Sequence, residues 1–157
     1  MARIKIELPE QFHFSTKIPI RITDLNYGGH VGNDTVLTLI HEARVQFLKS
    51  HGYEELNIEG VSLIMSDAGI EFKAELFYGD IVTAFVTATN FNRAGFDLFY
   101  KLMREQTMVA AAKTGMICYN YNTRKVVSVP AEVKEKLSRE ASILNREFES
   151  HSNREKR

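Results

Sequence analysis

The chain has 157 residues, of which 44% are hydrophobic and 25% are charged, and 20 Lys and Arg residues balance 20 Asp and Glu residues. This composition is typical of one soluble globular domain. Zero net charge disfavours nucleic-acid binding, which usually needs a basic excess, and it disfavours a polybasic membrane-surface protein. With the lone Cys118 and no apolar run near the ~20 residues of a membrane span, we expect a cytoplasmic location with no disulfide.

The first predicted element is a strand over residues 17–24. Ile18, Ile20 and Ile22 alternate there with polar residues, which indicates one buried face. A loop with three glycines follows at residues 25–32. Such a loop needs unusual backbone angles or close approaches of the backbone.

A long helix is predicted over residues 33–50. Asn33 or Asp34 would cap its start, and Gly52 would end it. Its apolar side chains cover so much of the surface that we expect other structure to wrap the helix.

The rest of the chain predicts strands at residues 61–65, 70–76, 81–89, 96–103 and 107–119, joined by short turns. Pro130 then opens a short helix over residues 131–138. Residues 1–149 would form one domain, and residues 150–157 a charged tail. This order predicts an α+β fold, in which a curved antiparallel sheet of about five strands wraps one buried helix.

Reactive side chains are densest where the first strand, the glycine loop and the long helix meet: Asp24, Asn26, His30, Asn33, His41 and Glu42. The free N–H groups of a helix's first turn can hold an oxyanion. Glu42, in the middle of an otherwise apolar helix, could act as a general base or nucleophile. The cluster therefore points to chemistry at the start of the helix.

Structural roles are the alternative for the same residues. Asp24 and Asn26 could cap the loop, and His30 could be a hydrogen-bonding residue near a turn. Glu42 could pair with Arg44, with a nearby lysine or with a partner chain. The spacing of His and Cys residues matches no metal motif, so we expect no metal site.

Residues 21–33, which read RITDLNYGGHVGN, followed by His41-Glu42-Ala43-Arg44, resemble the hotdog-fold acyl-CoA thioesterases of the 4-hydroxybenzoyl-CoA thioesterase type. The family pattern reads Arg-x-x-Asp-x-Asp, then Gly-His-Val-Asn-Asn, then Glu-Ala-Arg. Tyr78-Gly79-Asp80 and Val129-Pro130 are further matches. Together these motifs cover roughly residues 17–137.

The resemblance implies a long helix enclosed by an antiparallel sheet. It implies a homodimer with a continuous sheet, often paired into a homotetramer, with active sites between protomers. The reaction would be hydrolysis of an acyl-CoA thioester, without a cofactor, because CoA is part of the substrate. The thioester carbonyl would accept a hydrogen bond from a backbone N–H at the position of Asn33.

Two positions depart from the family pattern. Asn26 replaces the second Asp, the usual base or nucleophile, and an amide orients water but cannot take its proton. Gly32 replaces the first Asn of the Asn-Asn pair. Another branch of hotdog thioesterases carries its acid about two turns into the helix, so Glu42 is the expected base. Arg93, in a turn between strands, is the expected contact for the CoA phosphates.

Three other functions stay open at this point. Asn26 could make the chain a non-hydrolytic acyl-CoA-binding protein. A hotdog hydratase or dehydratase is a second possibility, although Asp24 with His30 does not match its motif well. The third is a structural or interaction domain, in which the glycine loop is only a turn.

Overall fold

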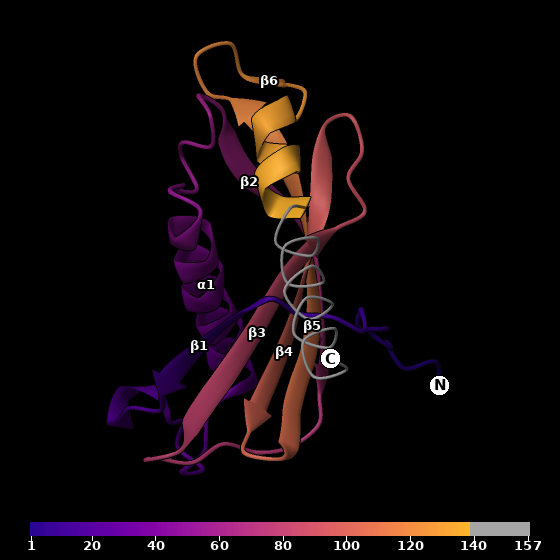
Figure 1. Ribbon diagram of the computed structural model, residues 1–157. Coiled ribbons are helices and arrows are strands. Elements are labelled where there is room, and N and C mark those ends of the chain that lie inside the picture. Colours follow the sequence, from indigo (N-terminus) through magenta and orange to yellow (C-terminus); the bar gives the residue numbers. More distant parts are fainter. Residues whose placement is uncertain (139–157) are drawn as a thin grey trace, which may run out of the picture.

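The computed structural model describes residues 1–138 and contains one long helix against a strongly twisted antiparallel sheet (Figure 1). The elements are β1 (Phe14–Pro19), η1 (Ile22–Asp24), α1 (Asn33–Ser50), β2 (Ser62–Phe72), β3 (Ile81–Thr89), β4 (Gly95–Arg104), β5 (Thr107–Asn120) and β6 (Lys125–Val126). The six-stranded sheet has the order β1-β3-β4-β5-β2, and β6 pairs with β5. The expected α+β class is confirmed.

A short helical segment follows Pro130 and occupies residues 131–138, as predicted. Its Val133 is fully buried, so the segment is anchored to the core. The charged tail predicted for residues 150–157 lies outside the described residues. Within residues 1–138, no helix is both long and apolar enough to cross a membrane.

One face of α1 carries the core of the molecule. Its buried side chains recur at three- and four-residue intervals and are Val36, Leu39, Ile40, Ala43, Arg44, Phe47 and Leu48. They pack on the concave face of the sheet, where β3 and β4 contribute fully buried side chains such as Val82 and Leu98. Burying one large apolar side chain stabilises the fold by about 1.5–3 kcal/mol. The opposite face is left open, with Leu37 and Val45 about 40% exposed, so the helix is not wrapped on all sides within one chain.

The ends of α1 differ from one another in how they are capped. Gly32 is the N-cap, and neither Asn33 nor Asp34 provides the predicted side-chain cap. At the other end, Gly52 adopts a φ of 78° and its N–H bonds to the Lys49 carbonyl, as predicted.

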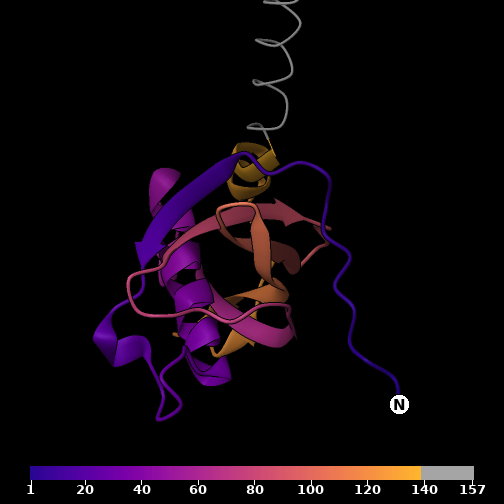
Figure 2. The same ribbon diagram turned by 90° about the horizontal axis from the view of Figure 1, so that it is seen from below.

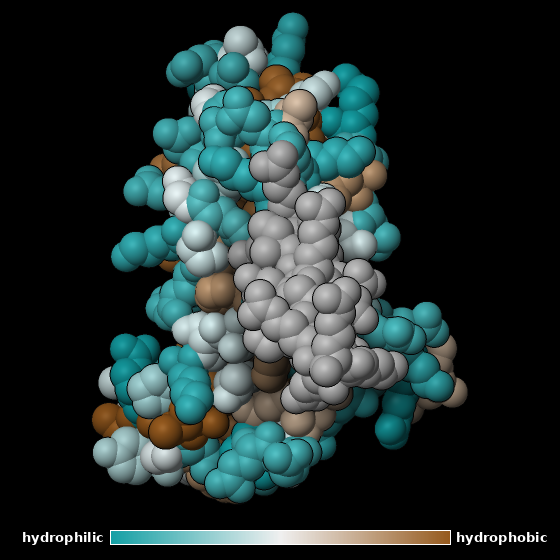
Figure 3. Space-filling model, in the orientation of Figure 1, coloured by the Kyte–Doolittle hydropathy of each residue, from teal (hydrophilic) through white to brown (hydrophobic). Residues whose placement is uncertain are grey.

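The first predicted strand is wrong at its C-terminal end. β1 begins at Phe14 and stops at Pro19. The Asp24 carboxylate accepts the Arg21 N–H at 2.8 Å, and the chain folds into the 3₁₀ turn η1. Ile22 is therefore 67% exposed. In Figure 3 an apolar patch lies at the lower left of the molecule, where Figure 1 draws the segment between β1 and α1.

Two predicted strands merge into one. Residues 62–65 and 70–72 belong to the single strand β2, which pairs with β5 along its length and has a bulge at Ser66. The chain leaves the sheet after Phe72, and buried Leu76 accepts the Val31 N–H at 2.9 Å. This hydrogen bond ties the start of α1 to the segment that follows β2. The two-residue strand β6 was not predicted.

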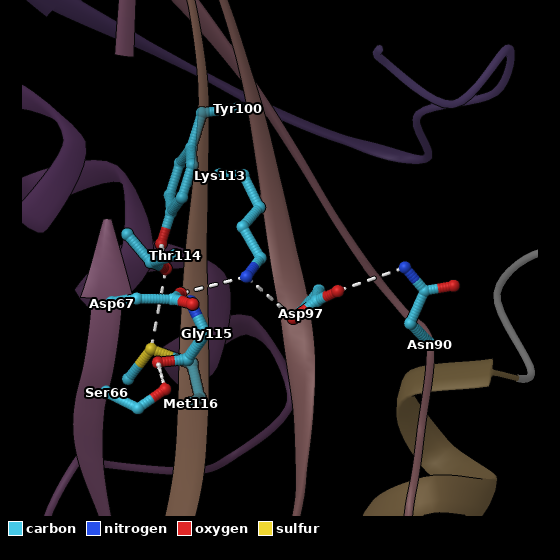
Figure 4. Close-up of polar contacts among 9 residues, drawn as sticks. All are labelled: Ser66, Asp67, Asn90, Asp97, Tyr100, Lys113, Thr114, Gly115 and Met116. Atoms are coloured by element: carbon cyan, nitrogen blue, oxygen red, sulfur yellow. Dashed lines mark hydrogen bonds and ion pairs between the residues drawn. The ribbon is translucent and has the colours of Figure 1, made fainter. Parts of the chain in front are cut away.

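Side chains replace part of the backbone pairing at the β2 bulge (Figure 4). Asp67 Oδ1 accepts the Gly115 N–H at 2.9 Å, and Ser66 Oγ donates to the Gly115 carbonyl at 3.1 Å. Lys113 Nζ lies 2.8 Å from Asp67 and 3.3 Å from Asp97, so it joins β5 to both neighbouring strands. The Lys113 ammonium and the Gly115 N–H together hold the pKa of Asp67 below its usual range.

The N-terminal segment covers the convex face of the sheet, opposite α1 (Figure 2). The Ile6 N–H donates to Glu71 on β2, and Phe12 contacts Phe85 on β3 edge to face. The Lys101 ammonium lies about 5 Å from the centroids of both Phe rings. The segment therefore runs across this face of the sheet, from β2 to β3.

We predict an acid-sensitive contribution to stability from Asp67. Because its pKa is lower in the folded protein, the contribution is complete above the unfolded-state pKa of about 3.9 and is lost as the pH falls through the folded-state pKa. Asp67→Asn should reduce the slope of unfolding free energy against pH below about 4, measured by urea unfolding. An unchanged slope would contradict this contribution.

We also predict that Gly95→Ala destabilises the protein by about 1–3 kcal/mol, the usual cost of overpacking. A Cβ at Gly95 would overlap the Met116 carbonyl oxygen on β5, which is backbone and cannot swing away. Gly69→Ala is the matched strand control, because its Cβ would meet the flexible end of Ile6 at 3.1 Å. Equal unfolding midpoints for the two variants would contradict the prediction.

Candidate active site

The glycine loop forms a tight hairpin that leads directly into α1. The Asn26 N–H donates to the His30 carbonyl at 2.9 Å, and Leu25 pairs with Val31. Gly29 has a φ of 80°, a conformation that favours glycine. The hairpin and the Val31–Leu76 hydrogen bond fix the position of the first turn of α1.

Two of the predicted site residues hold the loop itself. Asn26 Oδ1 accepts the Gly28 N–H at 2.8 Å, so its side chain forms a turn. Asp24 is only 6% exposed and bonds to the backbone and the guanidinium of Arg21. The structural roles considered for both residues are therefore real, although the Asn26 side chain is also exposed at the surface.

A hollow of about 240 Å³ lies beside the start of α1, and His30 and Asn33 line it together. The His30 ring contacts Phe77 edge to face, with 6.4 Å between the centroids. The first-turn N–H groups of a helix have no partner within the helix, and no side chain caps them at the start of α1. A partial positive charge at such a helix end attracts a developing oxyanion.

Lys73 and Glu75 line the same hollow, and sequence reasoning did not select them. Their alternation with apolar residues predicts the polar face of a strand. In the structure they follow the end of β2, where the chain passes the start of α1. Their position beside the start of α1 follows from the hydrogen bond between Val31 and Leu76, which the sequence alone does not indicate.

Glu42 and His41 line a different hollow, of about 390 Å³, between α1 and β1. Glu42 follows Asn33 by nine positions, which places it roughly 13.5 Å along the helix and about half a turn round it. It accepts a 2.7 Å hydrogen bond from Gln46, rather than pairing with Arg44. One chain therefore does not bring Glu42 and Asn33 into one hollow.

A buried polar network fastens α1 to the sheet. Arg44 is 6% exposed, and its guanidinium contacts Glu55 at 3.4 Å and the Tyr100 hydroxyl at 3.3 Å. Tyr100 in turn bonds to Thr114 at 2.8 Å, and burial raises the pKa of its hydroxyl (Figure 4). His41 approaches the same Glu55 at 2.6 Å. His41 and Arg44 thus have positions in a structural network.

Arg93 belongs to the turn between β3 and β4, and this turn lies at the opposite end of the sheet from the start of α1 (Figure 1). The Ile20 N–H bonds to the Asp80 carbonyl, so the segment that leads to the glycine loop lies beside the start of β3. Arg93 instead follows the end of β3. The nine residues of β3 span roughly 30 Å, so Arg93 is remote from the hollow of its own chain.

The other reactive groups have simpler positions. Cys118 is buried in β5, and burial raises its pKa to about 11. Within residues 1–138, no group of three His, Cys, Asp or Glu residues is placed to hold a metal ion.

Comparisons with known proteins agree with this architecture. The model of the thioesterase-like superfamily matches residues 20–137. The 1,4-dihydroxy-2-naphthoyl-CoA hydrolase of Microcystis aeruginosa is 31% identical over 121 residues, which are 73% of this chain and 86% of that protein.

Solved structures share the fold. A 1,4-dihydroxy-2-naphthoyl-CoA thioesterase from Synechocystis has a TM-score of 0.72 at 23% identity, over 79% of this chain and 94% of that one. A protein of Aquifex aeolicus has a TM-score of 0.73 at 27% identity, over 80% of this chain and 99% of that one. With the family match over most of its length, the chain belongs to the thioesterase-like superfamily of hotdog-fold proteins.

Proposed function

We propose that the protein hydrolyses an acyl-CoA thioester to a free acid and CoA. The observation that carries this proposal is the uncapped first turn of α1, which adjoins a hollow lined by His30 and Asn33. Family membership supports thioester chemistry in general. The N–H of Asn33 would donate to the thioester carbonyl and stabilise the negative charge that develops when water attacks.

Other residues would orient the reactants. The Asn26 amide can hold the attacking water through its free NH₂ group, because only its carbonyl oxygen is used by the loop. Lys73 lines the hollow of the same chain and would attract a CoA phosphate. Arg93 would serve this purpose only from another chain, because of its distance from the hollow.

The relative from Microcystis supports an aromatic acyl group as one substrate class to test. The acyl group would also contact a second protomer, because the apolar side chains of Leu37 and Val45 on the open face of α1 are left exposed within one chain. A panel of aromatic and aliphatic acyl-CoA thioesters therefore suits the first assay.

A second copy of the chain would complete the site by pairing along β2. This strand lies at the edge of the sheet, and the Leu63 N–H at its start already bonds to the Glu55 carbonyl. Past Leu63, no strand within the described residues pairs with its outer edge. Met65 and Phe72 on β2 are nearly half exposed, as are Leu37 and Val45 on α1. A long edge strand with exposed apolar side chains is prone to pair with a strand of another chain. We propose a homodimer through β2, or a homotetramer made of two such dimers.

Light scattering at micromolar concentration should therefore give at least twice the chain mass of 17.9 kDa. Met65→Lys places a charge on the β2 edge and should shift the equilibrium toward the monomer, because charged edges resist pairing. Val126→Lys, at a similarly exposed position on β6, is the control and should keep the wild-type mass. A stable wild-type monomer would contradict the dimer.

Asn33→Pro tests the role of the backbone N–H directly. Asn33 is the first residue of α1, where proline is tolerated, and Gly32 has the extended angles that suit a residue before proline. The variant should fold yet lose about 10²–10³-fold in kcat, the usual effect of removing one oxyanion donor.

Asn33→Ala is the matched control, since it removes the side chain and keeps the N–H. Equal activity of the Pro and Ala variants would contradict the assignment. Wild-type protein that binds acyl-CoA without turnover would favour the non-hydrolytic alternative, above all if Asn26→Asp created turnover. Hydration of crotonyl-CoA would favour the hydratase alternative.

A further inference from the structure

The structure places a carboxylate next to Asn26, from a residue that sequence reasoning considered only as a helix cap. A Cβ built at Gly32 would overlap Asp34 Oδ1 and would lie 3.7 Å from Asn26 Cβ. The Asp34 side chain therefore folds back over Gly32, so that the Asp34 carboxylate and the Asn26 side chain both lie beside Gly32. The carboxylate missing at position 26 is present in the neighbouring space.

Asp34 also lies close to the proposed oxyanion donor. Covalent geometry keeps the Cβ of a residue within about 3 Å of the next nitrogen, so Asp34 Oδ1 lies within roughly 6 Å of the Asn33 nitrogen. This separation leaves room for one water molecule between the carboxylate and a carbonyl group bound to Asn33. Asp34 is exposed, and the described residues provide its carboxylate with no hydrogen-bond or ion-pair partner.

We propose that Asp34 is the general base of the hydrolysis, an inference that rests on the proposed function. Its carboxylate would take a proton from water while the water oxygen forms a bond to the thioester carbonyl carbon. The resulting oxyanion would accept the Asn33 N–H. When the tetrahedral intermediate collapses, the C–S bond breaks, and the proton held by Asp34 passes to the leaving CoA thiolate.

Three other carboxylates lie in or near the candidate site. Asp24 is buried and committed to Arg21. Glu42 lines the hollow beside β1 and bonds to Gln46. Glu75 lines the hollow at the start of α1, and so it is the rival that the experiment must include.

The two departures from the family pattern both adjoin Asp34. An Asp at position 26 would put a second negative charge beside the Asp34 carboxylate, which Asn26 avoids. A side chain at position 32 would displace the carboxylate, which Gly32 avoids. Asn26, Gly32 and Asp34 thus form one compatible set.

The test compares Asp34→Asn with Glu42→Gln and Glu75→Gln in steady-state assays on a substrate that the wild type hydrolyses. Asp34→Asn should lower kcat by about 10²–10⁴-fold, the usual effect of losing a general base. It should also remove the acidic limb of the pH profile of kcat/KM. Glu54→Gln, an exposed carboxylate beyond the other end of α1, is the matched control and should keep wild-type activity.

Two further variants separate chemistry from folding. Gly32→Ala suits the extended backbone at that position but displaces the Asp34 carboxylate, so it should lower kcat in the wild type and have little further effect on Asp34→Asn. Asn26→Asp in the Asp34→Asn background restores a carboxylate in the same space and should recover at least tenfold. Asp34→Ser, which also suits a helix start, replaces Asp34→Asn if that variant fails to fold.

A wild type that hydrolyses thioesters while Asp34→Asn and Asp34→Ser stay within threefold of it would overturn the inference and leave the proposed function intact. So would a large loss confined to Glu42→Gln or Glu75→Gln. A wild type without turnover on the whole panel would overturn the proposed function, and the role of Asp34 with it.

Discussion

Burial of one face of α1 fixes the rotation of the helix about its own axis, and the candidate site depends on this constraint. Ile40, Ala43 and Leu48 are completely buried against the sheet. Because successive residues on a helix differ by about 100°, the remaining side chains have no freedom to change face. Arg44 also holds the helix in this orientation through its hydrogen bond to the Tyr100 hydroxyl. The Val31–Leu76 hydrogen bond fixes the position of the first turn along the helix axis.

The same constraint determines which residues can act together. Asn33 and Val36 face the hollow at the end of β2, whereas Thr38 and Glu42 face the hollow beside β1. The Asp34 carboxylate folds back over the N-cap residue Gly32, which also lies beside Asn26. The site we propose is thus assembled from the first turn and the preceding loop, and not from the middle of the helix.

Much of the fold could be predicted from the sequence, because the spacing of apolar residues indicates which face of a helix or strand is buried. The limits of α1 and the course of β3, β4 and β5 agree with their apolar patterns. The pattern failed at Ile22, because Asp24 closes a local turn that interrupts the alternation. It also divided β2, whose bulge hides the continuity of the strand.

The candidate site was less predictable. The glycine loop and Asn33 were found because motif and helix start coincide in the sequence. Asp34 was missed as a base because its closeness to Asn26 depends on the missing side chain of Gly32. The half-turn between Asn33 and Glu42 could have been counted from their spacing, and it would have weakened the prediction for Glu42.

A crystal structure with a non-hydrolysable acyl-CoA analogue tests the central claim most directly. Our account predicts the carbonyl oxygen of the analogue about 2.7–3.1 Å from the Asn33 nitrogen. It also predicts the Asp34 carboxylate on the side of the carbonyl carbon, with space for one water molecule between them. An analogue whose carbonyl lies in the hollow beside β1, next to Glu42 and away from the first turn of α1, would contradict the account.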